Sequence, residues 1–220
     1  MSVTTVETII NDRVKITLQE LAENGTRWTN AELMGWLNES YQTIIGLRPD
    51  AASVNEDLAL VAGTKQSIPA SGLRLLDVVR NTATSSNKRG VILASRRQLD
   101  STRRDWHGEP EQVSIEHYIF DDADPRNFYV YPPASVGATL EIIYSQVPVG
   151  HDYSVSKTDA IKLPDTYAPA ITDWIMFRCF SKDAEHAANA NRAQSHQAAF
   201  MNALGQKTAT DSATSPNGKV

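Results

Sequence analysis

The densest group of carboxylates in the sequence is Asp121, Asp122 and Asp124, which stands just before Pro125. Clustered oxygen ligands on one loop are the environment that Ca²⁺ prefers. The spacing of an EF-hand loop and its distal glutamate are missing, however, and Asp beside Pro is equally typical of a tight turn between two strands. We therefore interpret this group as a turn and assign no residue as a metal ligand.

Other catalytic or metal-binding patterns are also missing from the sequence. No histidine lies three or four residues from another, so helical zinc geometry is not indicated. There is no Gly-x-Ser-x-Gly motif, no Gly-x-Gly-x-x-Gly motif and no Walker loop. The single cysteine, Cys179, excludes a disulfide framework. We predict a protein that is not an enzyme and has no catalytic residue or cofactor; a metal-dependent hydrolase using the Asp121–Asp124 loop is one alternative.

Basic residues gather in one segment of a chain whose net charge is −5. Between positions 88 and 106, two aspartates stand against six basic residues, namely Lys88, Arg89, Arg96, Arg97, Arg103 and Arg104. The two arginine pairs lie seven residues apart, so a short helix would place them on one side. Such a side could contact DNA phosphate or an acidic partner surface, or it could simply be a solvated face.

Length and composition indicate a soluble globular chain. A chain of 220 residues buries roughly 70–75% of its unfolded surface, enough for one sizeable core or two small ones. No apolar run approaches the roughly 18 residues needed to cross a bilayer, and the N-terminus lacks a basic segment followed by an apolar one. We expect no membrane contact and assembly in a cytoplasm.

Helical periodicity marks both ends of the chain. Apolar residues from Val3 to Leu21 predict a first helix that ends at Asn24-Gly25, and Thr29 with Glu32 forms a capping box that opens a second helix reaching to Pro49. Near the C-terminus, Pro164-Asp165 opens a third helix. A fourth, Ala-rich run extends from 184 to 204 and ends at Gly205. This last run is either a surface helix or a helix that approaches another backbone closely.

Between the helix pairs the period changes to two. Residues 58–61 and 66–68 are interpreted as a hairpin, and further strands are predicted at 73–82, 113–120, 128–131 and 140–144. The predicted fold class is α+β: a four-helix bundle from 1–52 with 160–206, an inserted antiparallel β-sandwich or barrel-like module at 53–159, and an extended polar tail at 207–220.

Three stretches in this order resemble tailed-bacteriophage head-to-tail adaptors, the connector or tail tubular protein A-like family. They are Trp28 to Asn38 followed by Arg48-Pro49-Asp50-Ala51, then Asp124 to Pro133, and then Leu163 to Ala168 with Ser181 to Glu185 and Ala203 to Gly205. The resemblance covers nearly all of the chain except its final tail.

The resemblance implies a structural virion protein at the head-to-tail junction, assembled in the host cytoplasm. Members form a ring of about twelve copies between portal and tail, and a closed ring needs two different faces on each subunit. The implied partners are further copies, the portal protein through the C-terminal tail, a tail or nozzle protein on the opposite face, and genomic DNA that passes without sequence-specific binding. A monomeric peptide- or glycan-binding β module is the other alternative. The candidate partner-contacting residues are Arg96, Arg97, Arg103, Arg104, Lys207, Asp211, Lys219 and Val220.

Overall fold

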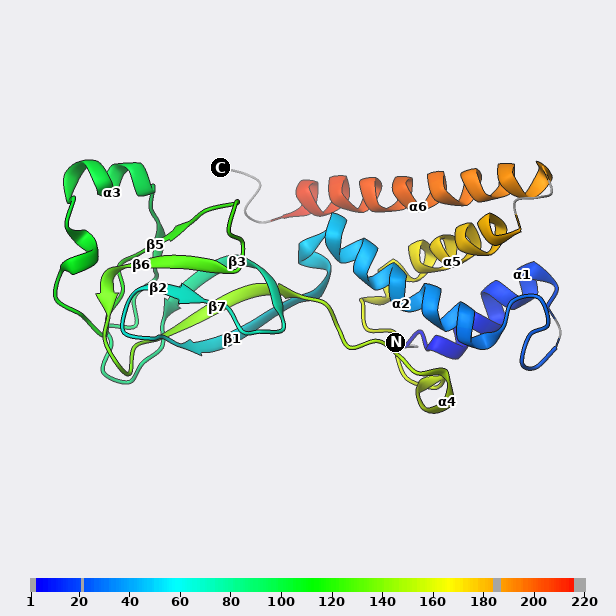
Figure 1. The fold of residues 1–220 in the computed structure, drawn as a ribbon, viewed down its shortest axis with the longest axis horizontal. Coiled ribbons are helices and arrows are strands. Elements are labelled where there is room, and N and C mark those ends of the chain that lie inside the picture. The colour runs from blue at the N-terminus through cyan, green and yellow to red at the C-terminus, as the bar shows by residue number, and fades with distance from the viewer. Residues whose placement is uncertain (1–2, 21, 184–186, 216–220) are drawn as a thin grey trace. The chain divides into compact units, whose positions relative to one another are not determined.

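The structure, a computed structural model, describes residues 3–20, 22–183 and 187–215 (Figure 1). The chain divides into two compact units, a helical unit of residues 1–51 with 148–220 and a β unit of residues 52–147. Within the described ranges, no helix is both long enough and apolar enough to span a membrane.

The N-terminal helix differs from the predicted one. Residues Thr8–Lys15 form a π-helical stretch that continues into α1 (Ile16–Leu18) and ends at Gln19, which is left-handed with φ 56°. The wider π turn brings Lys15 into the interior, where its Nζ donates to the Glu23 carbonyl at 2.7 Å. Burial lowers the pKa of Lys15. The predicted α-helix over 3–21 was therefore too long and of the wrong pitch.

Helix α2 (Asn30–Leu47) begins as the sequence predicts. The Thr29 hydroxyl accepts from the Glu32 amide at 3.3 Å, and the Glu32 carboxylate accepts from the Thr29 amide at 3.1 Å, which confirms the capping box. Trp28 is buried, and its Nε1 donates to the Cys179 carbonyl at 3.3 Å. The helix ends at Leu47 because Pro49 disfavours a helical residue before it.

Two C-terminal helices complete this unit. Helix α5 (Ala168–Lys182) follows a 3-10 turn (Asp165–Tyr167) and packs against α2, α6 (Ala187–Thr214) and the Thr8–Lys15 stretch, whereas α4 (Tyr153–Ser156) is a single turn. The apolar side of α6 is held by Phe200 and Leu204, and the Phe200 ring lies 5.0 Å from that of Trp174. A regular four-helix bundle remains a prediction.

The predicted end of the last helix at Gly205 is wrong. Helix α6 continues through this glycine to Thr214, so residues 207–214 are helical and not extended. Gly205 has helical backbone geometry, a Cβ added at this position would meet no atom within 4 Å, and the residue before it, Leu204, is buried. A glycine costs a helix interior only about 1 kcal/mol, which neighbouring contacts can offset.

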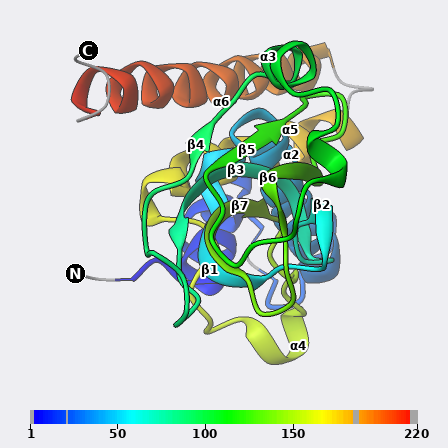
Figure 2. The same ribbon diagram turned by 90° about the vertical axis from the view of Figure 1, so that its left-hand side faces the viewer.

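The β unit consists of two open sheets (Figure 2). The first has the antiparallel order β1 (Ser53–Ala59), β7 (Thr139–Gln146) and β3 (Gly72–Asn81). The second has the order β2 (Gly63–Ser67), β6 (Asn127–Ala134), β5 (His117–Phe120) and β4 (Ile92–Leu93), with β4 parallel to β5. Neither sheet closes into a barrel. The predicted hairpin over 58–68 is also wrong, because β1 pairs with β7 and β2 pairs with β6.

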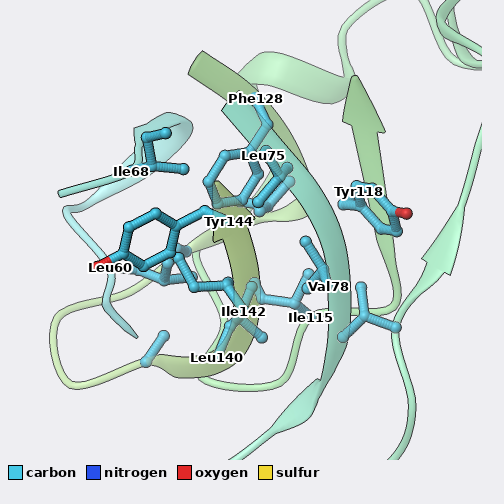
Figure 3. Close-up of a cluster of buried hydrophobic side chains, with 14 residues drawn as sticks. Leu60, Ile68, Leu75, Val78, Ile115, Tyr118, Phe128, Leu140, Ile142 and Tyr144 are labelled. Carbon is cyan, nitrogen blue, oxygen red and sulfur yellow. The ribbon is translucent and has the colours of Figure 1, made fainter. Parts of the chain in front are cut away.

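One apolar layer joins the two sheets (Figure 3). The first sheet contributes Leu140, Ile142 and Tyr144, and the second contributes Phe128 and Val130. These positions alternate along β7 and β6, as expected for strands with one face toward a core. The core of the β unit therefore consists of the inner faces of both sheets.

Ile142 and Ile143 provide a matched test of this alternation. Ile142 is fully buried between the sheets, whereas Ile143 is half-buried on the outer face. Ile142→Ala should lower the free energy of unfolding of the β unit by about 2–5 kcal/mol, since it leaves a cavity. Ile143→Ala should lower the free energy of unfolding by less than half of that amount. Urea denaturation followed by circular dichroism measures both losses. Equal losses would contradict the register.

Candidate partner interface

A basic helical segment covers the outer face of the four-stranded sheet. Helix α3 (Arg96–Thr102) and a 3-10 turn (Trp106–Gly108) place Leu99 and Trp106 over Ile119 and Tyr131. Trp106 is 1% exposed, and its Nε1 donates to Asp100 Oδ1 at 3.0 Å. This second apolar cluster fixes the segment to the sheet, and the candidate arginines stand on its solvent side.

The structure separates the four arginines of this segment. Helix α3 ends at Thr102, so Arg103 and Arg104 lie beyond it, and the prediction that one helix carries all four is wrong. Arg103 is held by Glu109 at 3.3 Å and by the Tyr131 hydroxyl. Arg96 lies 3.6 Å from Asp100. Arg97 and Arg104 are exposed and form no ion pair with any described residue.

Two further candidates, Lys207 and Asp211, belong to a cluster around Arg48. The Arg48 guanidinium is almost buried and donates to Asp50 Oδ1 at 2.9 Å, to the Thr208 hydroxyl at 2.7 Å and to Asp211 Oδ2 at 2.8 Å. Lys207 lies 3.2 Å from Asp211. The cluster joins the end of α2 to the last turns of α6, which explains why the helix persists beyond Gly205.

Charge within this cluster shifts the pKa values of its members. Hydrogen bonding and attraction from Arg48 lower the pKa of Asp50 and of Asp211, and Lys207 lowers that of Asp211 further. Asp50 in turn raises the pKa of Arg48. Both carboxylates are thus held in the charged form. The sequence did not single out Arg48, because its partner on α6 lies 163 positions further along the chain.

The last two candidates, Lys219 and Val220, lie outside the residues that the structure describes. A local indication of the Arg48 cluster was present in the sequence. In the stretch Arg48-Pro49-Asp50, a basic residue stands two positions before an acidic one.

The aspartate loop between β5 and β6 is a turn, as interpreted. The Asp121 carboxylate accepts from the Ala123 amide at 3.0 Å, and Asp124 accepts from the Asn127 side chain at 2.8 Å. Asp122 pairs with Arg74. Across the described ranges, no three His, Cys, Asp or Glu side chains are grouped so that they could hold a metal ion.

Two surface features are thus defined: a basic segment fixed to a sheet, and a C-terminal helix held near its end by Arg48. The SU10 adaptor protein family model matches residues 4–219. The chain belongs to the SU10 adaptor protein family, so it is a phage structural adaptor, a virion component that interacts with portal and tail proteins. No curated protein matches the sequence.

Replacing Arg48 tests the cluster. Arg48→Ala removes the hydrogen bonds that connect Asp50 to Thr208 and Asp211, and it should lower the stability of the helical unit by about 1–2 kcal/mol. Hydrogen exchange should accelerate more at residues 208–214 than at the buried Leu33 and Leu37 of α2. The control is Arg178→Ala, which breaks a half-exposed pair with Glu39 and should cost under about 1 kcal/mol. Unchanged exchange near Thr214 would contradict the role of Arg48.

The same cluster predicts a pH dependence. The pKa values of Asp50 and Asp211 are lower in the folded protein than the ordinary 3.8. The stability that these two carboxylates contribute is therefore complete above pH 3.8. It is lost as the pH falls through their lowered pKa values in the folded protein. The stability difference between wild type and Arg48→Ala should be largest at neutral pH and smaller near about pH 3 in denaturant titrations. A difference that does not change with pH would refute the assignment.

Proposed function

We propose that this adaptor forms a closed ring of about twelve copies at the head-to-tail junction of the virion, between the portal and the tail. Membership of the adaptor family over residues 4–219 is the observation that carries this proposal. A ring requires each copy to present two different surfaces to its neighbours, and the two compact units offer several candidate surfaces.

The C-terminal end is the proposed contact with the portal. Helix α6 is held to α2 by Arg48 up to Asp211, and the candidates Lys219 and Val220 follow shortly after it. A segment that starts from a fixed helix loses less conformational freedom on docking than one that starts from a flexible chain. The tail or nozzle protein would bind the opposite face of the ring.

Genomic DNA would pass through the lumen without sequence-specific binding. A chain with net charge −5 repels phosphate on average, so a ring of such chains would let the duplex slide. Assembly would take place in the host cytoplasm. A hydrolase finds no support in the described part of the chain, where the candidate carboxylates are engaged in a turn.

Truncation tests the portal contact. A chain that ends at Ser215 keeps Thr208 and Asp211, and therefore the Arg48 cluster, so its helical content and stability should equal those of wild type. Its co-sedimentation with portal-containing heads should fall at least about tenfold. The matched control keeps the length and replaces residues 216–220 with glycine and serine; it should also lose attachment. Full attachment of both variants would eliminate this contact.

The ring itself is tested by electron microscopy of the purified chain, alone and mixed with portal-containing heads. Rings, or a ring-shaped layer beneath the portal, are the expected result. A ring-forming protein can be monomeric until its partner is added, so the mixture is the deciding sample. A chain that stays monomeric in both samples would refute the proposal.

A further inference from the structure

The outer face of the three-stranded sheet carries two carboxylates in directly opposed positions. Leu58 and Leu140 belong to the apolar layer, so their neighbours Asp57 and Glu141 point to the opposite face. In the register of β1 and β7, Asp57 stands directly opposite Glu141. Like charges in directly opposed positions destabilise a sheet.

Of these two carboxylates, Glu141 pairs directly with Arg80, whereas Asp57 attracts Arg80 without forming an ion pair with it. Glu141 accepts from Arg80 at 2.6 Å and from Asn55 at 3.1 Å, and these contacts lower its pKa. Asp57 is exposed and has no ion pair with any residue in the described ranges. The neighbouring Glu56 belongs to the other side of β1, because it stands opposite the buried Ile142 and accepts from the Tyr144 hydroxyl at 3.0 Å. We call Asp57 and Glu141 the acidic face.

The other side of the same unit carries cations without partners. Lys65 stands opposite Tyr129 in the pairing of β2 with β6, and Tyr129 packs under the α3 segment, so Lys65 lies on the outer face of the four-stranded sheet. Lys65, Arg97 and Arg104 are exposed and form no ion pair with other described residues; we call these three the basic face. Asp105 lies in the same segment and lowers its net positive charge. The basic face is therefore defined by its individual unpaired cations and not by the net charge of the segment.

The two faces lie on opposite sides of one compact unit. The apolar layer separates the sheets, and the α3 segment is fixed to its own sheet by Leu99 and Trp106. Both views place α3 and β1 on opposite sides of the β unit (Figures 1 and 2). The acidic and basic faces therefore point in opposite directions, which is the arrangement a head-to-tail contact between identical copies needs.

We propose that the β units of neighbouring copies bind each other in the ring, the basic face of one copy against the acidic face of the next. This inference rests on the ring of the proposed function and adds which surfaces form it. An arginine from the neighbour would compensate Asp57, and repulsion between like faces would exclude the reverse orientation of a subunit.

Charge reversal tests the pairing. The variants are an all-acidic chain, Arg97→Glu with Arg104→Glu, and an all-basic chain, Asn55→Lys with Asp57→Lys, in which Asn55 is the exposed neighbour of Glu141 on the same face. Each alone should show at least about tenfold less ring on portal-containing heads by electron microscopy. An equimolar mixture should restore the rings, because the two chains can alternate. The control Lys88→Glu with Arg89→Glu changes residues of neither face and should assemble like wild type.

Cross-linking gives an independent readout. A chain with Asp57→Cys and Arg97→Cys, treated with a short bismaleimide during assembly, should give a ladder of covalent multimers. Either substitution alone should give none, since the native Cys179 is fully buried. Dimers from the Arg97→Cys chain alone would mean that like faces meet, which overturns the pairing.

The outcomes separate the two proposals. Wild-type rings with no effect of the reversals and no ladder would overturn the pairing and leave the ring intact; the charges on β1 would then only protect an edge strand from aggregation. If the all-acidic chain forms normal rings but retains double-stranded DNA more weakly, the basic face contacts DNA phosphate. This result would also overturn the pairing of the two faces. If the wild-type chain forms no rings, both the ring and the pairing of the two faces are refuted.

Discussion

The alternation of side chains along β5, β6 and β7 is the constraint on which the β unit depends. Because successive residues of a strand point to opposite faces, the same few positions fix the apolar layer between the sheets and the two outer faces. Tyr118 and Val130 point inward, and Ile119 and Tyr131 point outward to receive the α3 segment. A shift of one residue in either pairing would exchange core and surface together.

The helical unit depends on contacts of a different kind. Its core is apolar, from Ile10 and Leu37 to Ile171 and Phe200, but the end of α6 is held by hydrogen bonds to one nearly buried guanidinium. An arginine fits this position because its planar group can bond to several acceptors at once, which a lysine cannot reproduce. The residues that follow Asp211 thus start from a defined place.

The charged side chains of this adaptor fall into two kinds, those paired within the chain and those that form no ion pair with a described residue. Arg48, Arg103 and Glu141 are compensated within the chain and stabilise the structure that bears them. Arg97, Arg104 and Asp57 are exposed and form no ion pair within the described residues. Groups of the first kind contribute to stability, whereas groups of the second kind are accessible to neighbouring molecules.

Local features could be predicted from the sequence alone. The capping box at Thr29 and Glu32, the stop before Pro49, the aspartate turn and the strand alternation around Leu140 involve residues within a few positions of each other. That the chain is a phage adaptor could also be recognised from short stretches in order, whereas the tail tubular protein A-like subfamily stays a prediction. Only the tertiary structure decided the partner of β1, which is β7, the separation of the four arginines, and the helical state beyond Gly205. The physical reason is that strand pairing and the bond from Arg48 to Asp211 join residues far apart in the chain, and no local periodicity encodes such a partner.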